Sequence, residues 1–442
     1  MPESITSPTP SHPFSVFTQP LRHATRWLVL AVATGILAGS ASALLIVMLN
    51  RATDFRESHR WIIALLPIAG LAVGLLYHHF GHAVERGNNL ILEAIHTEVD
   101  EPQTTIPFRM TPLILLGTGI THLFGGSAGR EGTALQTGAS LADQIAVLLN
   151  RVPRLALSNS DRKILLMVGI SAGFGSVFGT PLAGAVFGLE VLTIGAISYQ
   201  AIFPCFLASF AADYVTHAFH IHPTLYTVTP AALETPLNPL NLLSSIAAGI
   251  VFGLTAMFFA RSTHAISRTF RRRISYAPLR PFLGGIILAL AVFSIGTTKY
   301  IGLGIPTILA AFSQHLPPFD FAAKFAFTTL TLGSGFKGGE VTPLFFIGAT
   351  LGNALSSVLP LPSSLLAAMG FVAVFAGAAN TPIASSLMAL ELFGPEAGAF
   401  AAIACVTSYL FSGHRGIYRA QRITGTKHPI EDEFPCDDYS QL

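Results

Sequence analysis

A few charged side chains stand within or beside long apolar stretches of the sequence. A charge inside a membrane is costly and is by default a sign of function. The carboxylates among them could compete with an anion for backbone donors, or carry a proton. The six residues are Arg130, Glu131, Glu190, Lys337, Glu340 and Glu391.

Glu131 has the most suggestive surroundings of the six. The segment 125–129 before it is rich in glycine, and Gly132 follows it. Glycine lets the backbone approach a ligand, and the free N–H groups and dipole of a helix starting here would form an anion site. The carboxylate could take the anion's place and leave it on protonation. The alternative is a helix cap that never moves, and composition weighs the two evenly.

A second helix start is predicted at Glu340. Gly339 precedes it, and Thr342 and Pro343 open the next apolar run. Proline is favoured in the first turn of a helix, and Thr342 is expected to cap this one. Glu340 would then be a second carboxylate at an inward-pointing N-terminus.

Two adjacent asparagines, Asn88 and Asn89, follow the second apolar stretch. Each amide offers two N–H donors and one acceptor, so the pair could contribute to an anion site. The alternative is an ordinary turn, which Gly-Asn sequences also form.

The composition sets the class of protein that must position these residues. The 442 residues are 51% hydrophobic and only 11% charged, with a mean hydropathy of +0.59. These values exclude a disordered chain, a nucleic-acid binder and a secreted disulfide scaffold, and they predict a polytopic membrane protein. The net charge of +2 implies no acidic partner. Cys205, Cys405 and Cys436 form no close pair, so neither a disulfide framework nor a metal site is expected.

Apolar stretches recur along the whole chain. Several are shorter than the ~20 residues that a full span needs, and most contain Gly or Pro. Short, interrupted helices are typical of transporters in which irregular backbone lines a polar cavity. The stretches are 27–49, 61–80, 111–124, 163–179, 201–219, 241–260, 281–296, 322–334, 342–359, 363–379 and 382–412.

The positive charges predict the orientation. Most of the 25 lysines and arginines cluster in four segments that we assign to the cytoplasm by the positive-inside bias. Arg51, Arg56 and Arg60 fall on the opposite side and oppose the rule. Both termini are expected in the cytoplasm, and residues 1–18 do not read as a signal peptide. We divide the chain into a cytoplasmic segment 1–26, two transmembrane halves 27–225 and 226–418, and a short cytoplasmic tail 419–442.

The two halves share sequence. Residues 174–192 can be laid on 375–393 with Phe, Thr-Pro, Ala, Leu and Glu in matching places, and 129–133 can be laid on 339–343. This predicts a duplicated fold with a substrate site at the repeat interface; the alternative is a chance match of apolar sequence. Glu190 and Glu391 occupy equivalent places, which favours a structural role such as satisfying backbone donors.

At these residues the sequence resembles the CLC family of anion channels and anion/proton exchangers. GREGT at 129–133 is similar to the family's GREGP motif, whose glutamate gates the external path and matches Glu131. Residues 179–184 resemble the NAPLAG segment and 338–343 the GGIFAP helix start, and Tyr418 matches the late tyrosine that faces the central anion. The resemblance implies an all-α polytopic membrane protein with two inverted-topology repeats, short broken helices and a homodimeric assembly.

Three departures point to one branch of that family. Asn88 replaces the serine of chloride-type members, Val191 stands where chloride/proton exchangers often have an internal glutamate, and Glu340 replaces an apolar residue. Together they resemble the fluoride-selective branch of fluoride/proton antiporters, which implies that Glu131, Glu340 and Thr342 serve gating and proton coupling. The residues that we assign to anion binding are Asn88, Asn89, Gly129, Arg130, Gly132, Gly339, Val341 and Tyr418.

The resulting expectation is a secondary active transporter that exchanges fluoride for protons in the bacterial inner (plasma) membrane. Fluoride is small and strongly hydrated, so a donor-rich filter suits it. The alternatives are a chloride/proton exchanger and a passive chloride channel of the voltage-gated type. An enzyme would need a nucleophile with a base, or a metal cluster, in the spans, and the sequence offers neither. The expected partners are fluoride or alternatively chloride, protons, the lipid bilayer and a second copy of the chain, with no cofactor and no nucleic acid.

Overall fold

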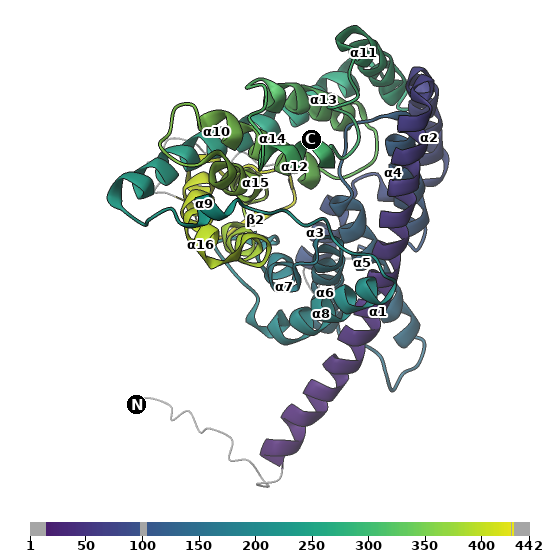
Figure 1. Ribbon diagram of the computed structural model, residues 1–442. Coiled ribbons are helices and arrows are strands. Elements are labelled where there is room, and N and C mark those ends of the chain that lie inside the picture. The colour runs from purple at the N-terminus through teal and green to yellow at the C-terminus, as the bar shows by residue number, and fades with distance from the viewer. Residues whose placement is uncertain (1–14, 98–103, 426, 428–442) are drawn as a thin grey trace, which may run out of the picture.

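The computed structural model describes residues 15–97, 104–425 and 427 (Figure 1). Residues 1–14 of the predicted N-terminal segment lie outside the described residues. So do residues 428–442 of the predicted tail, including Cys436. The described part is almost entirely helical, which confirms the predicted all-α membrane fold.

Five helices of the first half match the apolar stretches, and three others, which begin at Asn88, Glu131 and Pro181, lie between them. The structure has α1 (Ser15–Ser58), α2 (Leu66–Phe80), α3 (Asn88–His96), α4 (Met110–Phe124), α5 (Glu131–Leu149), α6 (Asn159–Phe178), α7 (Pro181–Glu190) and α8 (Ile202–Ala218). Single 3-10 turns occupy Arg60–Leu65, His82–Val84 and Tyr199–Ala201.

The second half repeats this order. It contains α9 (Pro230–Leu233), α10 (Pro239–Arg273), α11 (Leu279–Ile295), α12 (Ile305–Ala311), α13 (Asp320–Ser334), α14 (Val341–Leu355), α15 (Ser363–Ala379) and α16 (Pro382–Phe411). The short strands β1 (Thr193–Ile194) and β2 (Arg422–Ile423) pair in parallel and fasten the tail to the end of the first half.

Helix lengths agree with a membrane protein built partly from broken spans. Among the described residues, four helical segments are long and apolar enough to cross a membrane. These are Pro20–Ser58, Arg60–Phe80, Pro239–Arg273 and Pro382–Phe411. Shorter apolar helices such as α4, α11, α14 and α15 pack against them. In Figure 1, α14 and α15 lie beside α10 and α16, to the left of the long diagonal helix α1.

The duplication predicted from the sequence is present in the structure. Helices α4 and α13 begin 210 residues apart, have the same length of 15 residues, and each end at a left-handed glycine, Gly125 or Gly335. The next helices pack in the same way in both halves. A Cβ at Gly138 of α5 would lie 2.2 Å from the carbonyl oxygen of Gly169 in α6. Helices α14 and α15 are equally close, because a Cβ at Gly348 would lie 1.9 Å from a carbonyl oxygen of α15.

The equivalent glutamates join the two halves reciprocally. The carboxylate of Glu190, at the end of α7, accepts from two N–H groups at the start of α16, at 3.0 and 2.8 Å. The carboxylate of Glu391, in α16, accepts from two N–H groups at the start of α7, at 2.9 and 2.8 Å. Each acid thus satisfies donors that a helix N-terminus leaves free, which agrees with the predicted structural role.

Aromatic rings fill the centre between the halves. Phe174 of α6 stacks on Phe187 of α7 with ring centroids 4.1 Å apart, and on its repeat equivalent Phe375 of α15 at 5.9 Å. Phe345 and Phe371 stack at 4.0 Å in the second half. These fully buried, stacked rings pack the core between the two halves, beside the ends of the broken helices.

The structure differs from the sequence prediction at α1 and at one of its arginines. Helix α1 begins at Ser15, well before the predicted span at 27–49. Arg56 is not a surface charge, because it is 3% exposed and its Nη1 donates to the carbonyl oxygen of His122 at 2.7 Å. The positive-inside bias concerns charges in loops outside the membrane, and Arg56 is buried in protein. Only two of the three arginines that opposed the predicted orientation therefore still count against it. The orientation itself stays a prediction.

Candidate anion site

Two helix N-termini, those of α5 and α14, meet at the pair Gly129 and Gly339. The N–H of Gly129 donates to the carbonyl oxygen of Gly339 at 2.6 Å, and the N–H of Gly339 donates back at 2.8 Å. Neither position has room for a side chain. A Cβ at Gly129 would lie 2.7 Å from Oε2 of Glu131, and one at Gly339 would lie 2.6 Å from the nitrogen of Gly132. The positive ends of both helix dipoles therefore point into one small region.

Glu131 is the first residue of α5 and is completely buried. Its Oε2 accepts from the N–H of Thr342 at 3.0 Å and from the N–H of Arg130 at 3.1 Å. Its Oε1 accepts from the hydroxyl of Thr342, and Nε of Arg130 lies 3.7 Å from it. The carboxylate occupies the kind of donor cluster that binds anions at helix N-termini. The prediction that Glu131 lies at such a cluster agrees with this geometry.

Thr342 does not cap its own helix as predicted. Helix α14 begins at Val341, with Glu340 just before it, so Thr342 is the second helical residue. Its hydroxyl cannot act as an N-cap from inside the first turn, and it donates to the carboxylate of Glu131 instead. Both Val341 and Thr342 are buried, and the predicted gating residues Glu131 and Thr342 are in direct contact.

Asn88 and Glu340 converge on Gly132 from two other elements. A Cβ at Gly132 would lie 3.3 Å from Nδ2 of Asn88 and 3.7 Å from Oε2 of Glu340. Asn88 is the first residue of α3, which replaces the predicted turn, because Gly87 takes φ +57° and lets the chain enter a helix there. Within the described residues, Oδ1 of Asn88 and Oε2 of Glu340 are buried without a hydrogen-bond partner.

A cavity of about 20 Å³ lies between Asn88 and Tyr418. That volume accommodates about one water-sized particle. The hydroxyl of Tyr418 is buried without a hydrogen-bond partner among the described residues. The cavity is lined by Asn88, Ile91, Leu92, Leu135, Ile170, Phe187, Val191 and Tyr418. Val191, which stands where related exchangers carry an internal glutamate, therefore presents an apolar side chain to this space.

Asn89 is not among the residues that line the cavity, and its role in anion binding stays a prediction. Its Oδ1 accepts from the N–H of Ala420 at 3.1 Å, so it fixes the tail two residues beyond Tyr418. Successive residues of a helix point in different directions, which is why only one of the two asparagines faces the cavity.

No pattern in the sequence indicated the contacts that hold the tail. Nζ of Lys427 donates to the carbonyl oxygens of Tyr409 and Gly413, at 2.8 and 2.6 Å, and to Oγ of Ser412 at 3.0 Å. It thereby closes the C-terminal end of α16, where cations are favourable. Burial lowers the pKa of Lys427 to about 7. Tail and helix end together hold the segment that carries Tyr418.

Lys337 is not part of the donor cluster. Its Nζ lies 4.0 Å from the centre of the Tyr77 ring, and its side chain packs against Gly117. The predicted gating and anion-binding residues other than Asn89 lie on four elements: α3, α5 with the residues before it, α14 with the residues before it, and the tail.

Comparisons with known proteins agree with this arrangement. Residues 69–413 match the family model described as voltage gated chloride channel, and the chain belongs to that family. The resemblance to CLC proteins is thereby confirmed.

Three relatives are informative. A protein of Pseudomonas syringae pv. tomato named "Chloride/fluoride channel protein" is 52% identical over 430 residues, which cover 96% of this chain and 92% of that relative. A crystal structure of a CLC-type fluoride/proton antiporter superimposes with a TM-score of 0.85 at 33% identity, covering 94% of this chain and all of that one. A slow cyanobacterial Cl−/H+ antiporter superimposes with a TM-score of 0.76 at 21% identity, covering 89% of this chain and 96% of that one, and shows the shared fold.

Proposed function

We propose that this protein exchanges fluoride for protons across the bacterial inner membrane and thereby exports fluoride. The observation that carries the proposal is the buried carboxylate of Glu131, which accepts from the hydroxyl and N–H of Thr342 at the start of α14. A carboxylate bound by anion donors can be replaced by an anion once it is protonated. One side chain then alternates with the anion and carries the proton.

The preference for fluoride is supported by two polar side chains beside Gly132. Asn88 supplies an amide where chloride-type members supply a hydroxyl, and Glu340 adds a second carboxylate next to Gly132. Burying a strongly hydrated anion requires strong donors to replace its water. The names of the Pseudomonas syringae relative and of the 33% identical antiporter support the same choice.

The proposal includes the assembly and the orientation. Large apolar side chains are exposed on α7, α8 and α16, among them Leu182, Phe203, Phe210, Ile383 and Val406. Faces of this kind are covered by lipid or by a second copy, and we propose a homodimer with both termini in the cytoplasm. We also propose transport without a covalent step, so the protein is not an enzyme.

A chloride/proton exchanger is the second candidate, supported by the fold shared with the Cl−/H+ antiporter.

The test is a flux assay with purified protein in liposomes. Fluoride or chloride efflux and proton uptake are recorded together, with and without an opposing proton gradient. We expect fluoride to drive protons uphill and chloride to do so weakly. Equal coupling to both anions would favour the chloride exchanger, and anion flux without proton movement would favour a passive channel.

Replacement of the acid tests the role of Glu131. Glu131→Gln keeps the shape of the side chain but cannot release a proton, so we expect proton coupling to be lost. Glu396→Gln is the matched control, because Glu396 is an exposed carboxylate of α16 far from the donor cluster in sequence. Proton uptake that persists at the wild-type rate in Glu131→Gln would reject the proposed role.

A further inference from the structure

His122 is a buried histidine that the transport scheme leaves unexplained. It lies in the last turn of α4 and is 0% exposed. Its Nδ1 lies 2.9 Å from the carbonyl oxygen of Thr118 in its own helix, and its Nε2 lies 3.0 Å from the carbonyl oxygen of Ala128. Ala128 immediately precedes Gly129, so the histidine contacts the loop that leads to Glu131.

The peptide that joins Ala128 to Gly129 is held on both of its edges. Its carbonyl oxygen faces Nε2 of His122, and its N–H donates to Gly339 of the other half at 2.6 Å. Glycine tolerates both signs of φ, so a peptide next to it can turn over easily unless its partners prevent it. The next N–H along the chain, that of Arg130, donates to the carboxylate of Glu131. Turning this peptide would break the bond from Gly129 to Gly339, which holds the start of α5 against the start of α14 and so keeps Thr342 beside Glu131.

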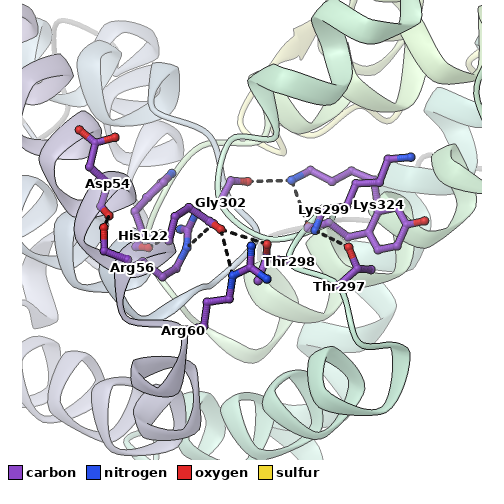
Figure 2. Close-up of polar contacts among 12 residues, drawn as sticks. Asp54, Arg56, Arg60, His122, Thr297, Thr298, Lys299, Gly302 and Lys324 are labelled. Carbon is purple, nitrogen blue, oxygen red and sulfur yellow. Dashed lines mark hydrogen bonds and ion pairs between the residues drawn. The ribbon is translucent and has the colours of Figure 1, made fainter. Parts of the chain in front are cut away.

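Two buried cations, Arg56 and Lys324, donate to neighbouring backbone carbonyls (Figure 2). Nη1 of Arg56 donates to the carbonyl oxygen of His122 at 2.7 Å. Nζ of Lys324 donates to the carbonyl oxygen of Gly302 at 2.7 Å, and the N–H of Gly302 donates to the carbonyl oxygen of Gly126 at 3.0 Å. The carbonyl oxygens of His122, Gly126 and Ala128 thus each have a hydrogen-bond partner in this cluster. His122 is the member of the cluster closest in sequence to Glu131.

We infer that His122 is a positioning residue for the gate. In the tautomer that carries its proton on Nε2, it donates to Ala128, fixes the peptide at Gly129 and so keeps together the starts of α5 and α14, which supply the donors of Glu131. The inference rests on the proposed function of Glu131. His122 does not transfer a proton in this scheme, because its ring nitrogens face backbone carbonyl oxygens and not a carboxylate.

Two amide replacements separate this role from a general effect on folding. The side-chain nitrogen of glutamine reaches the region of Nε2, whereas that of asparagine reaches only the region of Nδ1. His122→Gln therefore keeps a donor for Ala128, and His122→Asn keeps only the contact within α4. In the flux assay we expect His122→Gln to retain the wild-type ratio of protons to fluoride. We expect His122→Asn to show about a fivefold rise in fluoride flux without protons, as for the loss of one net hydrogen bond.

Hydrogen exchange gives a second measurement that does not depend on transport. We expect faster exchange of the amides in 125–131 in His122→Asn and wild-type exchange in His122→Gln. Wild-type hydrogen exchange and wild-type coupling in His122→Asn would overturn the inference. An equal loss of proton coupling in His122→Gln and His122→Asn, with both variants folded, would also overturn it. If His122→Asn fails to fold, the test rests on the ratio of protons to fluoride in folded His122→Gln. A wild-type ratio supports the inference, and a reduced ratio overturns it. Failure of the proposed function is distinct, because the wild-type protein itself would then move no protons with fluoride, while the exchange test still applies.

Discussion

Replacing Thr342 by valine tests the contact between the two halves of the site. Valine has the shape of threonine without the hydroxyl, so it removes the donor to Oε1 of Glu131 and keeps the N–H that donates to Oε2 at 3.0 Å. Thr342 is 3% exposed, and water cannot easily replace the lost hydroxyl. The carboxylate of Glu131 should then leave its donors more often. An anion at the position of Oε2 should lose less binding free energy, because the N–H of Thr342 is still present.

The structure sets the size of the effect. A hydrogen bond to a charged group contributes about 1.5–3 kcal/mol, and each 1.4 kcal/mol changes an equilibrium tenfold. The ratio of undocked to docked carboxylate should therefore rise roughly 10- to 150-fold. Coupling needs the acid to return after each anion has passed, so the ratio of protons to fluoride should fall while fluoride flux rises.

The assay is the paired fluoride and proton recording in liposomes, with Thr342→Ser as the matched control. Serine keeps the hydroxyl and should stay close to wild type. Two results would refute the reasoning: wild-type coupling in Thr342→Val, or an equal loss in Thr342→Ser. The first would show that the hydroxyl bond does not hold the gate, and the second that the methyl group matters instead.

Three further changes have defined outcomes. Asn88→Ser should lower the preference for fluoride over chloride by about tenfold, as expected when one donor of ~1.5 kcal/mol is weakened; an unchanged ratio of the two fluxes would count against a role in selection. Glu340→Gln should reduce proton coupling without changing the melting temperature, measured by fluorimetry on the same samples, and full coupling would remove Glu340 from the scheme. The melting-temperature difference between wild type and Lys427→Met should grow in favour of wild type from pH 7 towards 10.5. A lysine whose pKa is about 7 when docked binds fewer protons folded than unfolded in that window; a flat difference would mean that Lys427 titrates normally.

Much of the fold follows from the sequence because the membrane imposes simple rules. Lipid cannot satisfy the polar groups of the backbone, so an apolar run in a membrane must be helical. Each predicted run falls on helical residues, and only α1 and α10 extend more than ten residues beyond theirs. The repeat was visible because close helix packing permits only small residues at positions such as Gly138 and Gly348. Glu131 could be placed for the same reason, since glycines crowd the helix start before it.

The rest depends on contacts between distant segments. Helix α3 contains only nine residues and begins with two asparagines, so its pattern is that of a turn. Thr342 was assigned to its own helix because sequence proximity says nothing of Glu131, 211 positions away. His122 and Arg56 gave no signal at all: one lies in an apolar run and the other resembles a loop charge, and only the folded chain brings them together.

The reciprocal glutamates also constrain the order in which the chain is made. While the ribosome is still synthesising the second half, the start of α7 already exists, with N–H groups whose acceptor, Glu391, has not yet been made. The early half must therefore wait in an incomplete form, shielded by the insertion machinery or by water. It reaches its final packing only after α16 emerges, so a nascent chain stopped before that helix should be prone to degradation.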